Sequence, residues 1–149
     1  GQEGKIYSGT QPMPAIMGMW GAVEELPNLT EQLAKTRQLR DYFVAEAIKI
    51  DGLCINSGDD ALPYIVNISL PGHPSQTVLN FLSDRGIYVS GGSACSKGHR
   101  SKVLTAMGLP PERIDSALRI SFSRFTTKEE IDMLLCGLES AENSLRKKM

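Results

Sequence analysis

The chain has few cysteines, and their arrangement excludes two classes of small protein. Cys54, Cys95 and Cys136 are the only cysteines among its 149 residues. An odd number cannot pair completely into disulfides, and no CxxC or Cys/His spacing suggests a structural zinc site. The sequence therefore favours a reduced compartment, and we expect a cytoplasmic location and no metal.

The chain also lacks a charge excess and long apolar runs. Its 16 Lys and Arg residues against 17 Asp and Glu residues leave a net charge of −1. This balance gives no general positive field for nucleic acid. No apolar run approaches the roughly 20 residues that span a bilayer, and nothing resembles an N-terminal signal. We expect neither direct nucleic-acid binding nor a membrane partner.

Apolar periodicity instead predicts a small globular domain of alternating helices and strands. Helices are expected from Pro14 to Pro27, from Asn28 to Asp51 and Gly52, from Pro74 to Asp84, from Ser101 to Met107, and from Thr126 with Glu129 onward. Strands are expected at Leu53–Asn56, Tyr64–Leu70, Ile87–Val89 and Leu118–Ser123. Three strands alternate cleanly between apolar and polar residues, which predicts an α/β (α+β two-layer) unit. Its small, mainly antiparallel sheet is covered by helices on one face.

Cys95 is the candidate nucleophile. It lies in a run of small residues, Ser-Gly-Gly-Ser-Ala-Cys-Ser-Lys-Gly at 90–98, which cannot supply a core and predicts an accessible loop. Lys97, His99 and Arg100 are cationic or donor groups that can lower a thiol pKa. The alternative is a small residue in a tight turn.

The other two cysteines and His73 are expected to have structural rather than catalytic roles. Cys54 and Cys136 lie in apolar periodic segments and are expected in the core. His73 lies in a Pro-Gly-His-Pro turn and is expected to be solvated, and neither His73 nor His99 has a partner at metal-ligand spacing.

Arg119 alternates with Leu118 and Ile120, so its side chain should point from the opposite face of the strand. A guanidinium there can hold a carboxylate, or it can be a surface arginine.

Four ordered motifs resemble the C-terminal part of NifS/IscS-type cysteine desulfurases. These are Ser-Gly-Gly-Ser-Ala-Cys-Ser at 90–96, Val-Leu-Thr-Ala-Met-Gly at 103–108, Leu-Arg-Ile-Ser at 118–121, and Arg-Phe-Thr-Thr-Lys-Glu-Glu-Ile-Asp at 124–132. Gly-Gln-Glu at 1–3 and Ser-Gly-Thr-Gln at 8–11 resemble segments that follow the cofactor lysine in that family. The resemblance covers essentially the whole chain.

The resemblance implies the C-terminal domain of a fold-type I, class V aminotransferase-like enzyme that uses pyridoxal 5'-phosphate. Such enzymes convert L-cysteine to L-alanine, and an active-site cysteine takes the sulfur as a persulfide. By resemblance, Cys95 is that carrier, Arg119 holds the substrate carboxylate, and Thr10 reaches the cofactor phosphate of the neighbouring subunit in a homodimer. The cofactor acts as an electron sink for the substrate carbanion.

The resemblance also implies a division of the chain and a missing part. Residues 1–27 would follow the large cofactor domain and include a linking helix, and residues 28–149 would form the small domain. The family's cofactor-binding lysine, aspartate and histidine have no match here. Because these residues are missing, we expect the 149 residues to be inactive alone. The chain also starts without Met, as if cut from a longer protein. Tyr7 replaces a usual arginine, and the segment from Cys95 to Val103 is shorter than in long-loop members.

Two other functions remain open from the sequence. A class V aminotransferase or selenocysteine lyase shares the fold but explains Cys95 less well. A cofactor-free thiol interaction module is the alternative outside enzymes. For a desulfurase, the sulfur acceptor is undefined: an iron-sulfur cluster scaffold, a tRNA-thiolating enzyme and thiamin biosynthesis are candidates.

Overall fold

A computed structural model describes residues 9–91 and 100–147. The chain divides into two units, Gly1–Gln32 and Leu33–Met149, which are described separately. Helix α1, Met13–Glu24, lies in the first unit, with a proline in its first turn as the sequence predicts. None of its residues is buried.

Helix α2, Leu29–Ala47, begins at the predicted cap. The Asn28 Oδ1 atom accepts hydrogen bonds from the backbone N–H groups of Thr30 and Glu31, at 3.0 and 3.3 Å. These bonds satisfy donors that have no partner within the helix. Phe43 and Ala47 are fully buried, as the predicted apolar stripe requires. The helix ends at Ala47 rather than near Asp51, because the following residues form a turn that leads to Gly52 at φ +72°.

The sheet has three antiparallel strands in the order β1-β2-β3. The strands are β1 at Cys54–Ile55, β2 at Ile65–Ser69 and β3 at Ala117–Ser121. Asn67 is paired with Arg119, and Ile68 with Leu118. The expected mainly antiparallel sheet and α/β fold class are therefore confirmed.

The two faces of the sheet differ in character. Val66, Ile68, Leu118 and Ile120 are buried on the first, which we call the core face. Asn67, Arg119 and Ser121 alternate with them on the second, the polar face. Strand alternation separates the two sets, because successive side chains point to opposite faces.

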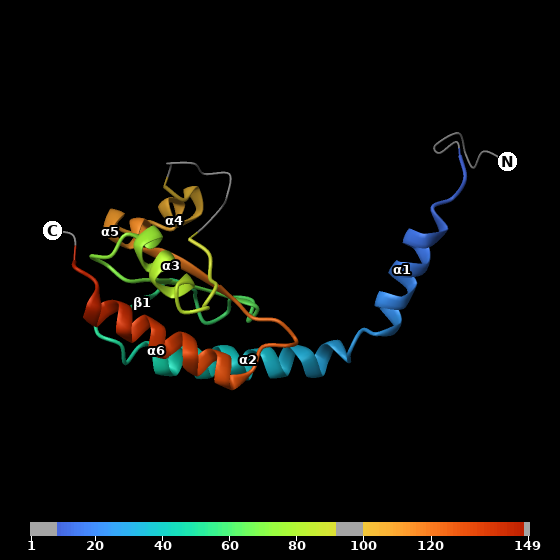
Figure 1. The fold of residues 1–149 in the computed structure, drawn as a ribbon, viewed down its shortest axis with the longest axis horizontal. Coiled ribbons are helices and arrows are strands. Elements are labelled where there is room, and N and C mark those ends of the chain that lie inside the picture. Colours follow the sequence, from blue (N-terminus) through green and yellow to red (C-terminus); the bar gives the residue numbers. More distant parts are fainter. Residues whose placement is uncertain (1–8, 92–99, 148–149) are drawn as a thin grey trace. The chain divides into compact units, whose positions relative to one another are not determined.

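Helices α2 and α6, Lys128–Ser144, cover the core face (Figure 1). The buried residues of α6 include Ile131, Leu134 and Leu138. Tyr42 on α2 donates a 2.5 Å hydrogen bond to Asp132 on α6. This bond, assisted by desolvation and by the carboxylate charge, raises the pKa of Tyr42 to about 12.

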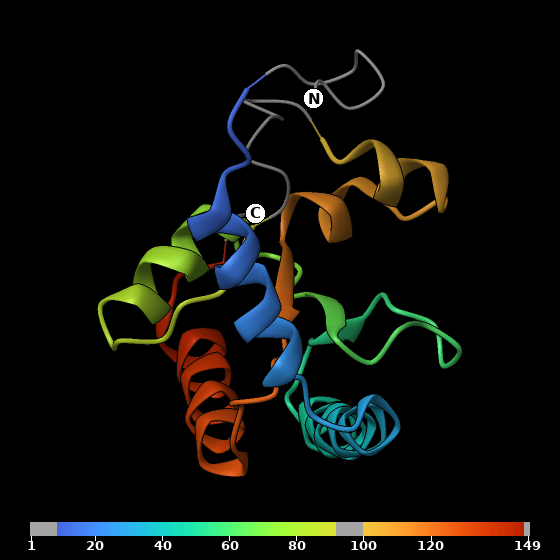
Figure 2. The same cartoon turned by 90° about the vertical axis from the view of Figure 1, so that its right-hand side faces the viewer.

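Three shorter helices complete the second unit. They are α3 at Ser75–Ser83, α4 at Lys102–Ala106 and α5 at Pro111–Asp115. A small cluster of Leu104, Ile114 and Ala117 attaches α4 and α5 to the start of β3, away from α2 and α6 (Figure 2). The sequence predicts α3 and α4 but misses α5, which begins at Pro111 after Pro110 as its N-cap. Pro111 fits there because a first helical residue needs no N–H partner.

Two local predictions at chain turns are wrong. Ile87–Val89 is not a strand, and only Ser90 forms an isolated bridge, with Arg119. Helix α6 begins one residue later than predicted, with a capping box of Thr127 and Glu130. Thr126 is not the cap because its hydroxyl accepts the N–H of Ser123 in the preceding turn, at 2.9 Å.

Three predictions of burial are also wrong. Cys136 is exposed, since the buried stripe of α6 passes through Leu134 and Leu138 on either side of it. Cys54 is half-buried, at the edge of the sheet. His73 is only 1% exposed, because a turn through Gly72 at φ +92° directs it inward.

Buried His73 faces an acidic partner on the last helix. Its Nε2 atom lies 3.0 Å from Glu142 Oε2, at ion-pair distance but without hydrogen-bond alignment. Glu142 also pairs with Lys147. This cluster joins the turn after β2 to the end of α6.

Candidate functional site

A cavity of about 710 Å³ lies over the polar face of the sheet. Strand β2 contributes Asn67 and β3 contributes Arg119 to its lining. The helical side contributes Leu104 and Met107. The cavity thus combines an apolar wall with polar groups on a regular sheet, an arrangement typical of small-molecule sites.

Arg119 lies on the predicted face of β3. It is exposed, while its neighbours Leu118 and Ile120 are buried. Its backbone is fixed on both sides: Asn67 is its partner on β2, and Ser90 exchanges two hydrogen bonds with it at 2.6 and 3.1 Å. Within residues 9–91 and 100–147, its guanidinium makes no hydrogen bond or ion pair. Those donors are therefore available to a ligand in the cavity.

Two residues near Cys95 in sequence also line the cavity. Gly91 and Arg100 flank the segment 92–99. A Cβ atom at Gly91 would lie 2.8 Å from Leu79 Cδ1, so glycine permits the chain to pass close to α3. Cys95 itself, with Lys97 and His99, lies outside the described residues, and its predicted role remains a prediction.

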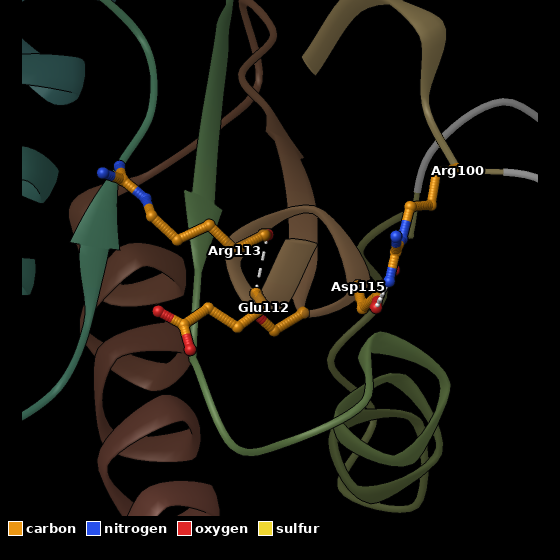
Figure 3. A network of polar contacts seen from close by, with 5 residues as sticks. Arg100, Glu112, Arg113 and Asp115 are labelled. Atoms are coloured by element: carbon orange, nitrogen blue, oxygen red, sulfur yellow. Dashed lines mark hydrogen bonds and ion pairs between the residues drawn. The ribbon is translucent and has the colours of Figure 1, made fainter. Parts of the chain in front are cut away.

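Arg100 is already paired. Its Nε and Nη2 atoms donate to the two carboxylate oxygens of Asp115 at 2.7 Å each, and Figure 3 shows the Arg100 side chain extending to Asp115. The hydrogen bonds from Arg100, more than its charge, lower the pKa of Asp115 despite partial desolvation. Both side chains are about half exposed, at 53% and 51%. The charge of Arg100, which the sequence suggested for a nearby thiol, is therefore largely directed at Asp115.

Sequence reasoning missed a partly buried polar network on the same face. Arg113 extends from α5 toward β1 (Figure 3) and donates to the Asn56 side chain and to the Ile55 carbonyl. Asn56 in turn bonds Asn67 and Ser69. One signal for Asn67 was available, since it alternates with Val66 and Ile68 as Arg119 alternates with its own apolar neighbours. Arg113 gave none, because α5 itself was not predicted.

The remaining predicted site residue is Thr10, which is exposed in the first unit. No group of three or more His, Cys, Asp and Glu side chains among the described residues could hold a metal ion. No helix in the described part of the chain is long and apolar enough to cross a membrane.

Comparison with known proteins decides the family. The sequence model described as Aminotransferase class-V matches residues 1–134. The chain belongs to this family. Its members generally depend on pyridoxal phosphate, and the resemblance stated from the motifs is thereby confirmed.

Several relatives in the family are cysteine desulfurases. The chain is 32% identical to cysteine desulfurase IscS of Dictyoglomus turgidum over 150 residues, covering 97% of the chain and 38% of that protein. It is 35% identical to cysteine desulfurase IscS of Methanosarcina thermophila over 138 residues, covering 90% of the chain and 34% of the relative. The chain therefore spans little more than a third of these relatives.

Solved structures of NifS-like proteins also match the chain. A structure named NifS-like protein superposes with a TM-score of 0.77 at 32% identity, covering 97% of the chain and 38% of that structure. The NifS-like protein of Rickettsia africae gives a TM-score of 0.78 at 28% identity, with 96% and 38% covered. The matched length therefore includes residues of both units.

Proposed function

We propose that the chain is the substrate-binding and sulfur-carrying part of a cysteine desulfurase. In this proposal the whole protein converts L-cysteine to L-alanine, and Cys95 carries the sulfur to an acceptor. The relatives named cysteine desulfurase support this choice within the class V family.

Arg119 is the observation that carries the proposal. Its guanidinium is exposed in the cavity and is not engaged by other described residues. A planar guanidinium recognises a carboxylate through two parallel charge-assisted hydrogen bonds. We assign it to the carboxylate of L-cysteine. The segment that carries Cys95 is joined at both ends to cavity-lining residues, which supports a shared site.

The sulfur transfer is balanced without a further oxidant. The Cys95 thiolate attacks the substrate sulfur, so an S–S bond forms and the substrate C–S bond breaks. The electron pair of that C–S bond stays with the substrate carbon, which takes up a proton to give alanine. Cys95 is left as a persulfide, in which the transferred sulfur is already at the oxidation level of a disulfide.

The described residues alone do not make a pyridoxal phosphate site. Among residues 9–91 and 100–147, no lysine lines the cavity, and Asp115 is paired with Arg100. We therefore propose that the cofactor lysine lies outside these 149 residues, and that the chain alone does not convert cysteine. Thr10 is proposed to reach the cofactor phosphate of the partner subunit in a homodimer.

The proposal extends to the organisation and setting of the protein. Residues 1–27 are proposed to follow the cofactor domain and residues 28–149 to form the small domain. A cytoplasmic location and a protein acceptor of sulfur, in iron-sulfur cluster assembly or tRNA thiolation, are proposed on the same grounds.

The test uses the full-length protein containing this chain. Cys95→Ser should abolish transfer of sulfur to the protein while leaving L-cysteine binding intact. The matched control is Cys136→Ser, which removes an exposed thiol in the middle of α6. Mass spectrometry of the trapped persulfide and an alanine assay give the readouts. Persulfide formation that survives Cys95→Ser, or is lost in Cys136→Ser, would contradict the assignment.

A further inference from the structure

Asn67 is the side chain next to Arg119 on the polar face. The two residues are directly opposed in the β2–β3 register, and both line the cavity. Directly opposed residues of antiparallel strands have Cβ atoms about 4.5–5.5 Å apart. A single small ligand can therefore reach both side chains.

The orientation of the Asn67 amide follows from a chain of donors that begins at Arg113. A guanidinium can only donate hydrogen bonds. Arg113 places Nε 3.0 Å and Nη2 2.5 Å from the same side-chain atom of Asn56, which must therefore be the acceptor Oδ1. Arg113 Nη2 also donates to the Ile55 carbonyl, at 2.8 Å.

With its oxygen fixed, Asn56 must present Nδ2 to its other neighbours. This atom lies 2.7 Å from a side-chain atom of Asn67 and 2.7 Å from Ser69 Oγ. Because Nδ2 donates, the Asn67 atom is Oδ1. Ser69 Oγ then donates to the Arg113 carbonyl at 2.6 Å, which closes the network.

The Nδ2 end of the Asn67 side-chain amide is left to contact a ligand. Its Oδ1 is held by Asn56, and Nδ2 has no acceptor among the described residues. Asn56 is 8% exposed and Ser69 is fully buried, so water competes poorly for the bonds that fix this orientation. Both Asn67 and Arg119 therefore offer only N–H donors to the cavity.

We propose that Asn67 donates a hydrogen bond from Nδ2 to the carboxylate that Arg119 binds, and that Arg113 is a positioning residue that holds Asn67 in this orientation through Asn56. The inference rests on the proposed function, because the carboxylate is that of the amino-acid substrate or product. It adds Asn67 as a second group that recognises the carboxylate, and it gives the partly buried Arg113 a role in orienting Asn67.

The test measures dissociation constants by calorimetry on the full-length protein. The ligands are L-alanine and L-alaninamide, which differ only in the carboxylate and carry no sulfur to transfer. Asn67→Asp replaces the donor by a like-charged acceptor and should weaken L-alanine binding at least about tenfold, the effect of losing one hydrogen bond to a charged group. Binding of L-alaninamide should not weaken.

Asn56→Asp tests the positioning step without removing either proposed contact. A carboxylate at position 56 only accepts, so Asn67 must turn its Nδ2 toward Asp and its oxygen toward the cavity. L-Alanine binding should again weaken about tenfold and L-alaninamide binding should not. Asn80→Asp makes the same chemical change at an exposed site of α3 and should alter neither constant.

Arg113→Met and Arg113→Lys cover the case in which Asn56→Asp does not fold. The methionine variant loses the donor to Asn56, so its binding of L-alanine should weaken while its binding of L-alaninamide does not. The lysine variant keeps a donor and should recover part of the lost affinity for L-alanine.

The outcomes separate this inference from the proposed function. If Arg119→Lys weakens L-alanine binding but the changes at Asn67 and Asn56 do not, the inference is overturned and the proposed function stands. Equal weakening of both ligands by Asn67→Asp would mean a general disturbance and would also overturn it. If Arg119→Lys binds L-alanine normally, the proposed carboxylate site itself is wrong.

Discussion

The core face and the polar face of the sheet are built from alternating residues of the same strands. On β3, Leu118 and Ile120 are buried under the helices, and Arg119 between them is exposed in the cavity. On β2, Asn67 lies in the same way between Val66 and Ile68. A strand held firmly by its apolar residues therefore fixes the positions of its polar ones.

The comparison also separates two kinds of energy. The core face is stabilised by removal of apolar surface from water, which is non-directional. The polar face depends on directed hydrogen bonds, whose loss changes what is recognised more than whether the chain folds. Substitutions on neighbouring residues of one strand should therefore affect different measurements.

Leu118→Ala should give the largest effect. The side chain is fully buried in the main core, and Leu→Ala at such sites costs about 2–5 kcal/mol of unfolding free energy. Urea unfolding followed by circular dichroism measures the loss. The control is Arg119→Ala, one residue along the strand but exposed, which should change stability by no more than about 0.5 kcal/mol. Equal losses at both positions would remove the distinction between the faces.

Arg119→Lys should have the next largest effect, on binding. It keeps the charge but not the planar pair of donors, so roughly 1.5–3 kcal/mol is lost, a ten- to hundredfold rise in the apparent Kd for L-cysteine. Titration of the full-length protein measures it.

Arg124→Lys is the matched control. Arg124 is exposed, its guanidinium lies 4.7 Å from the centre of the Phe125 ring, and it does not line the cavity. Normal binding in Arg119→Lys together with weak binding in Arg124→Lys would transfer the carboxylate role to Arg124.

The sequence was sufficient for the features that depend on local pattern. Period-two alternation predicted β2 and β3 and the opposite orientations of Leu118 and Arg119. The class V motifs led to the family. These succeed because alternation and capping are set by neighbouring residues.

What the sequence could not predict depends on contacts between distant segments. The Arg113–Asn56 bonds join residues from α5 and the end of β1, and the missed helix α5 hid the donor. His73 faces Glu142 near the end of α6, which a local reading of the Pro-Gly-His-Pro turn could not show. Cys136 was predicted to be buried because its neighbour Leu135 is apolar, but the buried stripe of α6 does not include it.

Thr127→Ala should destabilise the helix that covers the core face. The Thr127 hydroxyl accepts the N–H of Glu130, and the Glu130 carboxylate accepts the N–H of Thr127 at 3.0 Å. Loss of such a cap costs about 1 kcal/mol, measurable by urea unfolding. Thr30→Ala, in the first turn of α2 but not at its cap, should leave stability nearly unchanged. A similar loss in both variants would show that the cap is not the cause.

The smallest effect is expected for the exposed pair at the cavity rim. The hydrogen bonds from Arg100 lower the pKa of Asp115, so the folded state favours the ionised carboxyl. The stability that this pair adds is present above the pKa of an unfolded aspartate and is lost as pH falls through the lowered pKa. Because both side chains are half exposed, solvent screening keeps the contribution small.

Carboxyl ¹³C resonances followed against pH should show Asp115 titrating below the ordinary range of an aspartate. Arg100→Gln should return it to that range, whereas Arg85→Gln, whose guanidinium lies over the Phe81 ring on α3, should not. An unchanged Asp115 titration in Arg100→Gln would mean that the pair is not formed in solution. If the pair is formed, Arg100 is engaged at neutral pH, and Arg119 is then the cation among the described cavity-lining residues that is available for the proposed carboxylate contact.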